Sequence, residues 1–566
     1  MAAAEGPWNP GLTSTIPDRL MPRATLFDPR NGSLGWEDAR GLSEVVGLPP
    51  QLLATFKPSR LVLHHLLIRV TGGLHVPDGP SYSDLGINLR NMVTAIDSGY
   101  VAPALDAIAA AHARLCREAE AIITGELRDI VLARSAGRAQ RSRLLEWLVG
   151  KSSERPGRSR NEQAVDYAGR WSGEDTADDL HSQCRHALAR TLGAILSRRG
   201  ALLVDEDIII RVATNLVANS AGSDLVGRLV APLFDQGAAA LGYHRLPPQD
   251  DPVVLNTKGA SAAGKSSIRP QQRRIAKNLG LDWRDFAIIS PDYWRKKLID
   301  YFSLGKDCKY AAMLTGQELE IIDQKLDRLL AENAARGDFP HLLVDRFRFD
   351  SFQSDPRHQS AGKLLARFGS RVYLFFLVTP PQETVVRAWR RGLETGRFKA
   401  VDDLLFHNIE AYSGMPGLFF YWALRRRKSV HYEFLDNSVA RGQTPRTIAF
   451  GRDGRLVIQD IRTFCDIERF RHVNVEASDE TQVIARQPSD YEAMAFVRRC
   501  CTTLDRVDFV LRGTDRIYAT AKTGKIVVDP GLVPPELCVD ALGDVTLAAA
   551  TLGALEAGAR ADTIGA

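Results

Sequence analysis

Hydrophobic positions divide the chain into parts with different periods. Between residues 59 and 245 they recur at spacings of three and four, which is the period of amphipathic helices. One apolar stripe follows 104–133, and a second follows 180–195 after Thr176, a candidate N-cap. The pattern therefore predicts a mainly helical domain over 59–245. Residues 1–58, rich in Pro, Gly, Asp and Asn, are predicted to be extended and loop-rich.

The pattern changes after the segment RLPPQDDP at 245–252. From there, short apolar runs alternate with helical stretches, in one of which Thr315 and Glu318 have the spacing of a capping box. The runs are 253–255, 286–289, 342–344, 372–378 and 432–435. Because strands that alternate with helices favour a parallel sheet covered on both faces, 250–475 is predicted to be a doubly wound α/β domain. Residues 490–566 are predicted to form a small α+β segment.

Composition narrows the class of protein. The chain has 566 residues, of which 45% are hydrophobic and 25% charged, so wholesale disorder is excluded. The net charge of +5 is too small to indicate nucleic acid or a membrane as a partner. The 7 scattered cysteines include no CxxC pair, and neither a signal peptide nor an apolar run of about 18 residues is visible. We expect a cytoplasmic protein, although an effector delivered into a host would look the same.

The strongest motif is GASAAGKS, the phosphate-loop (P-loop) pattern of two glycines followed by Lys and Ser. The glycines allow successive backbone amides to face phosphate oxygens. Lys265 would then reach the β- and γ-phosphates of ATP, and the Ser266 hydroxyl would bind Mg²⁺. The alternative is a small-residue turn that matches by accident. The predicted nucleotide-binding residues are Gly259, Ala260, Ser261, Ala262, Ala263, Gly264, Lys265, Ser266 and Ser267. Pro270 should kink or shorten the helix that follows.

Two acids follow predicted strands. Asp292 comes directly after the apolar run 286–289, at the end of a strand, where doubly wound sheets bind ligands. It could accept a proton from a substrate hydroxyl, or it could simply cap the next helix. Asp345 ends the run HLLVD, the form of a Walker B strand whose acid contacts Mg²⁺.

A basic stretch, RAWRRGLETGR at 387–397, is the fourth candidate. Its arginines could close over the transferring phosphoryl group as a lid and neutralise its charge. A solvated helix face in an arginine-rich chain is the alternative reading of the same residues.

Taken in order, these motifs resemble the zeta-toxin family of P-loop kinases. The GASAAGKS loop, the IISPD acid, the LLVDRFRF strand, the lid ending in TGR and the DNS triplet at 436–438 carry the resemblance. It covers roughly residues 250–475. The lid, together with the acid after the second strand, separates zeta toxins from other kinases that share the loop.

The resemblance implies phosphorylation, with ATP and Mg²⁺, of a hydroxyl on a nucleotide-type substrate. Family members act on UDP-N-acetylglucosamine, and related ones on other nucleotides, including a dinucleotide. Asp292 matches the general base, and Arg387 and Arg397 match the phosphate-binding arginines. Asp345 and Arg348 are the expected substrate contacts. An antitoxin or chaperone is the protein partner that such a toxin or effector would have.

Two other functions remain open at this point. The chain could be a non-catalytic nucleotide-binding regulatory module, which would need the loop but not Asp292. It could also be a polynucleotide kinase, which should carry a basic groove for phosphate backbones. The net charge of +5 gives that second alternative little support.

Overall fold

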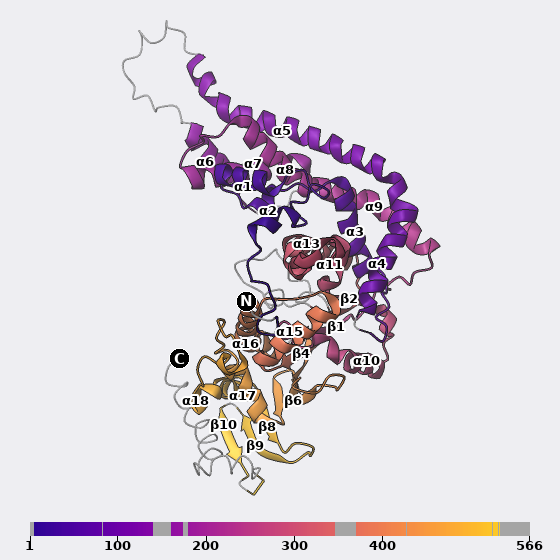
Figure 1. Cartoon of the computed structure of the whole chain (residues 1–566), viewed down its shortest axis with the longest axis vertical. Coiled ribbons are helices and arrows are strands. Elements are labelled where there is room, and N and C mark those ends of the chain that lie inside the picture. Colours follow the sequence, from indigo (N-terminus) through magenta and orange to yellow (C-terminus); the bar gives the residue numbers. More distant parts are fainter. Residues whose placement is uncertain are drawn as a thin grey trace.

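The computed structural model describes residues 5–81, 83–139, 160–173, 179–345, 369–425, 427–522, 524–529 and 531–532. Two residues singled out above, Thr176 and Arg348, lie outside these ranges. Helices fill the upper half of Figure 1, and a ten-stranded sheet with its own helices fills the lower half. The predicted α/β class is confirmed for the sheet region. Within the described ranges no helix is both long and apolar enough to cross a membrane.

The sheet runs in the order β10-β9-β8-β7-β6-β5-β4-β1-β3-β2. Its strands are β1 (Val253–Lys258), β2 (Phe286–Ile289), β3 (His341–Val344), β4 (Arg371–Val378), β5 (Ser429–Asp436), β6 (Arg446–Arg452), β7 (Arg455–Ile458), β8 (Arg506–Val510), β9 (Ile517–Lys522) and β10 (Lys525–Val528). The first five strands pair in parallel, with every residue of β1 buried between β3 and β4. From β1 the chain moves to the β2 and β3 side and then crosses to β4. The carboxyl end of β1 is therefore a topological switch point, where such sheets bind ligands.

The remaining strands extend the same sheet. The β6–β7 hairpin turns at Asp453 and Gly454, with φ values of 49° and 86°, which suits the Asp-Gly turn of a tight hairpin. Strand β8 pairs in parallel with β7, and β9 and β10 complete the sheet as an antiparallel pair. The strands of the predicted C-terminal segment thus continue the sheet that begins with β1.

The helices before the sheet are α1 (Trp36–Val46), α2 (Pro50–Leu53), α3 (Pro58–Gly73), α4 (Asp84–Ile96), α5 (Leu105–Ala139), α6 (Arg160–Arg170), α7 (Leu180–Arg199), α8 (Glu206–Asn219) and α9 (Ala221–Ala240). From α3 on, they form in the region predicted to be helical. The prediction that 1–58 is extended is wrong for α1 and α2, and Ala39, Leu42 and Val46 form a short buried stripe on α1. The observed N-cap of α7 is Asp179, whose carboxylate accepts a hydrogen bond of 2.9 Å from the Ser182 amide. Gly200 ends α7 with φ 70°, a left-handed conformation that glycine adopts readily at helix ends.

The helices after β1 lie around the sheet. They are α10 (Arg269–Asn278), α11 (Arg295–Leu298), α12 (Ala311–Leu314), α13 (Gly316–Ala335), α15 (Pro381–Thr395), α16 (Val401–Ala423), α17 (Ile461–Arg469), α18 (Asp490–Ala493) and α19 (Ala495–Thr503). Short 3₁₀ turns precede or follow several of them.

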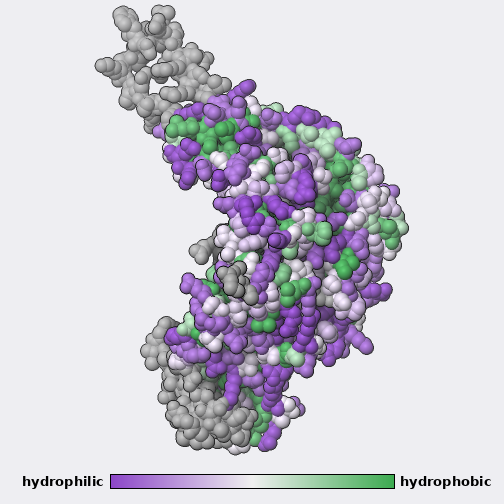
Figure 2. Space-filling view, in the orientation of Figure 1, coloured by the Kyte–Doolittle hydropathy of each residue, from purple (hydrophilic) through white to green (hydrophobic). Residues whose placement is uncertain are grey.

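Two large hydrophobic cores hold the molecule together. The larger one joins the sheet to side chains of α3, α4 and α9, so part of the N-terminal helical region packs directly on the α/β region. The smaller core lies among α1 and α5–α8. Figure 2 shows a largely hydrophilic face, and its outline is hollowed between the N-terminal helices and the sheet region. The domain boundaries given above remain predictions.

The capping box predicted at Thr315 and Glu318 is wrong. The Thr315 hydroxyl donates to the Ala311 carbonyl at 3.0 Å, because the preceding helix α12 continues almost directly into α13. Glu318 is fully buried and accepts hydrogen bonds from Arg60, at 2.5 and 2.7 Å, and from His64 at 2.7 Å. A contact with α3 therefore replaces the local cap.

Candidate functional site

The P-loop follows β1 at the switch point, and both of its glycines lie in close contact with neighbouring residues. At Gly259, a Cβ atom would lie 3.0 Å from the Cβ of Leu377 on the neighbouring strand β4. Gly264 has φ 87°, in the left-handed region, and a Cβ there would collide with the side-chain amide of Asn437. The spacing that predicted the loop therefore corresponds to Gly264, where only glycine fits, and to Gly259, where a side chain would be crowded against β4.

Residues that follow two neighbouring strands support the P-loop through hydrogen bonds. The Asn437 side chain donates to the Ala263 carbonyl at 2.6 Å, and the Thr379 hydroxyl donates to the same oxygen at 3.1 Å. These residues follow β5 and β4, so the loop conformation depends on two adjacent strand ends. Asn437 belongs to the DNS triplet, whose structural role the sequence did not reveal.

After the loop, the chain forms a 3₁₀ turn, η4 (Lys265–Ile268), before α10 begins at Arg269. Pro270 lies in the first turn of α10, where its missing amide costs nothing. The predicted shortening of the α-helix is confirmed. The Ser267 hydroxyl donates to the Gly264 carbonyl at 2.7 Å and fixes the turn.

Lys265 folds back over the loop. Its Nζ donates to the carbonyls of Gly259 and Ala260 at 3.3 and 3.2 Å. Burial lowers the pKa of Lys265 below its ordinary value, and the nearby carboxylates of Asp345 and Asp292 oppose that shift. The positive charge of the Lys265 ammonium is therefore stabilised by two carboxylates, which follow the strands β3 and β2.

Asp292 lies in the 3₁₀ turn η6 (Pro291–Trp294), directly after β2. Its side chain caps neither η6 nor α11. Instead it accepts a hydrogen bond from Arg295 at 3.0 Å and forms an ion pair of 2.5 Å with Arg397. Burial favours the protonated acid, but Arg397, Arg295 and Arg391 outweigh it and hold the pKa of Asp292 well below its usual range. The side chain is thus an ionised group held between Arg295 and Arg397.

Arg295, three residues after Asp292, was not recognised from the sequence. One of its terminal nitrogens donates to the Ala312 carbonyl and, at 2.7 Å, to the Thr315 hydroxyl. These bonds fix the guanidinium on the side of Asp292 that faces α12. The sequence RKKL indicated only a helix, and nothing in it separates Arg295 from its basic neighbours.

The predicted lid corresponds to α15 and the turn after it. Gly396 ends the helix with φ 75°, which turns the chain so that Arg397 reaches Asp292. Arg387 instead bonds to Glu383 on its own helix and to the Asn437 carbonyl, both at 2.6 Å. The two arginines predicted to have one role therefore contact different groups. The interpretation of 387–397 as a uniformly solvated helix face does not describe Arg397, whose side chain is 11% exposed.

Asp345 directly follows β3, and its amide donates to the Ile289 carbonyl of β2 at 2.9 Å. Its Oδ1 atom is buried without a hydrogen-bond partner in the described part of the chain. An unpaired buried carboxylate oxygen beside the P-loop suits a Mg²⁺ ion or a ligand hydroxyl, and Ser266 adds a further oxygen donor. These oxygens fit the expected metal. Arg348, the other expected substrate contact, lies outside the described residues.

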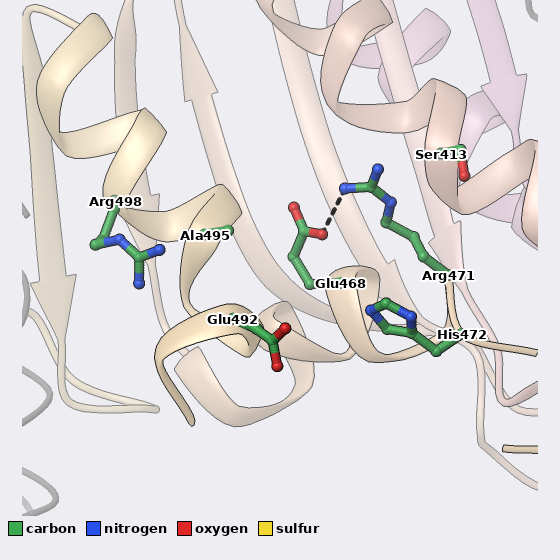
Figure 3. A pocket seen from close by; sticks show the side chains of 7 residues that line it. All are labelled: Ser413, Glu468, Arg471, His472, Glu492, Ala495 and Arg498. Carbon is green, nitrogen blue, oxygen red and sulfur yellow. Dashed lines mark hydrogen bonds and ion pairs between the residues drawn. The ribbon is translucent and has the colours of Figure 1, made fainter. Parts of the chain in front are cut away.

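A separate cavity of about 360 Å³ lies between α16, α17 and the α18–α19 region. Figure 3 shows the side chains that line it. It is lined by Ser413, Glu468, Arg471, His472, Glu492, Ala495 and Arg498. Glu468 is paired with Arg471 at 2.6 Å, and Glu492 is paired with Arg486 at 2.8 Å. The cavity shares no residue with the P-loop, the lid or the strand-end acids, so it does not bear on the chemistry there.

Comparison with known proteins adds little. No protein-family profile matches the chain, and no curated protein matches it. A solved structure from the characterisation of the PezAT chromosomal toxin–antitoxin system of Streptococcus pneumoniae aligns with 16% identity and a TM-score of 0.23. The alignment covers 34% of this chain and 69% of that one. A match this distant carries no argument about function.

Proposed function

We propose that this protein is a kinase that transfers the γ-phosphoryl group of ATP to a hydroxyl of a nucleotide-type acceptor. The acceptor would be a nucleotide sugar such as UDP-N-acetylglucosamine, or a dinucleotide. The observation that carries the proposal is the ion pair between Asp292 and Arg397 beside the P-loop lysine. A strand-end acid and a lid arginine from distant segments meet there, and phosphoryl transfer to a hydroxyl uses both kinds of group at one site.

The donor nucleotide would lie in the P-loop. The amides of residues 259–267 would face its phosphates, and Lys265 would leave its two loop carbonyls to reach the β- and γ-phosphates. Ser266 would hold Mg²⁺, which neutralises phosphate charge when it is bound. Asp345 would offer its unpaired oxygen at the same edge of the sheet.

Asp292 would accept the proton of the acceptor hydroxyl as that oxygen attacks the γ-phosphorus and ADP leaves. A carboxylate whose pKa is held well below its usual range is a weak base. Arg397 is one cause of that low pKa, so its movement from Asp292 to the γ-phosphoryl oxygens would raise the pKa of Asp292. Closing the lid on ATP would thus activate the base.

The test is to incubate the full-length chain with labelled ATP and a panel of nucleotide sugars, dinucleotides and nucleosides, followed by mass spectrometry. A phosphorylated acceptor is expected, and it should disappear with Lys265→Ala. Lys277→Ala, an exposed lysine on α10, is the matched control and should keep full activity. ATP binding without transfer to any acceptor would instead indicate a non-catalytic nucleotide-binding module. Transfer to oligonucleotide ends would indicate a polynucleotide kinase.

A further inference from the structure

Tyr301 lies beside the proposed base, although nothing in the motifs marks it. It follows α11 and directly precedes the 3₁₀ segment η7 (Phe302–Tyr310). The lid packs on its ring, since a Cβ built on Gly396 would lie 3.2 Å from the Tyr301 Cδ2 atom. Gly396 immediately precedes Arg397, the residue that is paired with Asp292. The tyrosine is therefore covered by the same turn that brings the lid to the base.

The Tyr301 hydroxyl is buried and has no hydrogen-bond partner among the described residues. Four charged side chains influence the pKa of this hydroxyl through their charges: Arg295, Arg397, Asp292 and Arg391. Burial outweighs the arginines and raises the pKa of Tyr301, so the hydroxyl keeps its proton. A buried hydroxyl without a partner is unfavourable in the free protein. The cost is removed when a ligand supplies the missing partner.

The adjacent residue shows that hydrophobicity alone does not explain this arrangement. Phe302 is 94% exposed, whereas the more polar Tyr301 is turned inward. If the position beneath the lid needed only an apolar ring, phenylalanine would fill it without leaving a hydroxyl unpaired. The inward residue is the one with a hydrogen-bonding group.

The chemistry of the neighbours indicates which ligand group would bind. The arginines only donate hydrogen bonds, which suits phosphate oxygens, and an ionised Asp292 only accepts them. A neutral tyrosine both donates and accepts, as a sugar hydroxyl does. The group beside Asp292 that matches Tyr301 is therefore a second hydroxyl on the molecule whose first hydroxyl is deprotonated.

We propose that Tyr301 binds the acceptor, through a hydrogen bond to a sugar hydroxyl next to the one that Asp292 deprotonates. The inference rests on the proposed kinase function and deepens it. It assigns the acceptor to molecules with neighbouring hydroxyls, as on a ribose or pyranose ring. In the reaction Tyr301 keeps its proton, and the transferred proton goes to Asp292.

The test compares Tyr301→Phe with wild type, using MgATP with UDP-N-acetylglucosamine and with NAD⁺ as acceptors. The variant removes one oxygen atom and leaves the ring beneath the lid. Loss of one neutral hydrogen bond should lower kcat/KM for the acceptor about three- to tenfold. The KM for ATP should stay within twofold, and the melting temperature should not fall, because the hydroxyl has no internal partner. The matched control is Tyr310→Phe, whose hydroxyl accepts a hydrogen bond of 3.3 Å from the Thr13 amide, and which should leave acceptor kinetics unchanged.

The outcomes separate this inference from the proposed function. Wild-type transfer with unchanged acceptor kinetics in Tyr301→Phe overturns the inference and leaves the kinase intact. A lower melting temperature in that variant also overturns it, since the hydroxyl would then have a structural partner. An equal rise in the KM for ATP would place Tyr301 at the donor instead. If wild type phosphorylates neither acceptor, the proposed acceptor class fails and the inference fails with it.

Discussion

The guanidinium of Arg397 lies 2.5 Å from the carboxylate of Asp292, which precedes it by 105 residues. The lid residue predicted to bind phosphate and the acid predicted to act as base are thus each other's partners in this structure. Because Arg397 also lowers the pKa of Asp292, the position of the lid and the strength of the base are linked. In the proposed reaction, phosphate groups and Asp292 would compete for Arg397, and the predictions for these two residues rest on that competition.

Arg397→Ala should lower kcat far more than it weakens ATP binding. Its charge matters most when negative charge redistributes on the phosphoryl oxygens, and comparable arginines contribute on the order of 10³-fold. Steady-state kinetics with a separate ATP-binding titration would measure both effects. Arg390→Ala, at an exposed position on α15, is the control and should stay near wild type. An unchanged kcat in Arg397→Ala would mean that the ion pair with Asp292 has only a structural role.

Asn437→Ala should act mainly on ATP affinity. The side-chain amide of Asn437 donates to the Ala263 carbonyl of the P-loop, and the backbone carbonyl of Asn437 accepts a hydrogen bond from Arg387. Loss of the amide contact should raise the Kd for ATP about five- to tenfold, or roughly 1 kcal/mol. Arg387→Ala should raise the Kd for ATP by a similar factor, because Arg387 holds Asn437 in place. Titration with ATP would measure both variants, and unchanged affinity in both would show that the loop keeps its shape without this support.

The features of the site that depend on a few consecutive residues were predictable from the sequence. Gly259 and Gly264 have the spacing of a tight phosphate-binding turn; a side chain would be crowded at Gly259 and would collide at Gly264. Asp292 was found because it directly follows an apolar run that forms β2. In each case a few consecutive residues contain the whole signal.

The contacts between distant segments were not predictable. Arg295 was one of three consecutive basic residues, and only the position of α12 shows which of them holds Asp292. Glu318 had the spacing of a capping residue, but α3 brings Arg60 to it from 258 residues away. Glu318 pairs with Arg60 and takes no part in a cap, because an unpaired buried charge costs far more free energy than a missing helix cap.

The buried cluster between α3 and α13 gives a prediction about pH. Lys325 donates to the His64 ring at 3.1 Å, and its surroundings lower the pKa of the lysine to about 7, with burial as the largest cause. The unfolded chain binds this proton more tightly than the folded one. Stability should therefore rise as pH increases from about 7 toward the ordinary lysine pKa of 10.5, and the full cost of charging Lys325 applies below pH 7.

Lys325→Met should accordingly stabilise the protein most at or below neutral pH, and this advantage should shrink as the pH approaches 10. The gain comes from removing the cost of charging a buried lysine, which the lowered pKa of Lys325 reflects. Melting temperatures of variant and wild type at pH 6.5 and 9.5 would measure the difference. Lys306→Met, at an exposed position, should show no such pH dependence. A Lys325→Met variant less stable than wild type at pH 6.5 would mean that the hydrogen bond to His64 outweighs the burial of the charge.

Asp292→Asn tests the proposed base directly. The amide keeps the size of the side chain but cannot accept the hydroxyl proton, so phosphoryl transfer should fall at least ~100-fold. ATP binding should stay within a few-fold of wild type, because the donor contacts come from the P-loop. The melting temperature should fall slightly, since Arg295 and Arg397 lose their shared carboxylate. Kinetics, ATP titration and calorimetry on the same preparation would measure all three quantities.

The double variant Asp292→Asn with Arg397→Ala separates the two roles of the arginine. With Asp292 ionised, Arg397 must leave it in order to reach the γ-phosphoryl group. With asparagine there is no ion pair to break, so in the Asp292→Asn background Arg397 should favour ATP binding more than it does in the wild type. Its removal from Asp292→Asn should therefore weaken ATP binding more than its removal from wild type. Equal effects in the two backgrounds would show that Asp292 and the phosphates do not compete for Arg397. Retained transfer in Asp292→Asn would move the base elsewhere, with Asp345 and its unpaired oxygen as the next candidate.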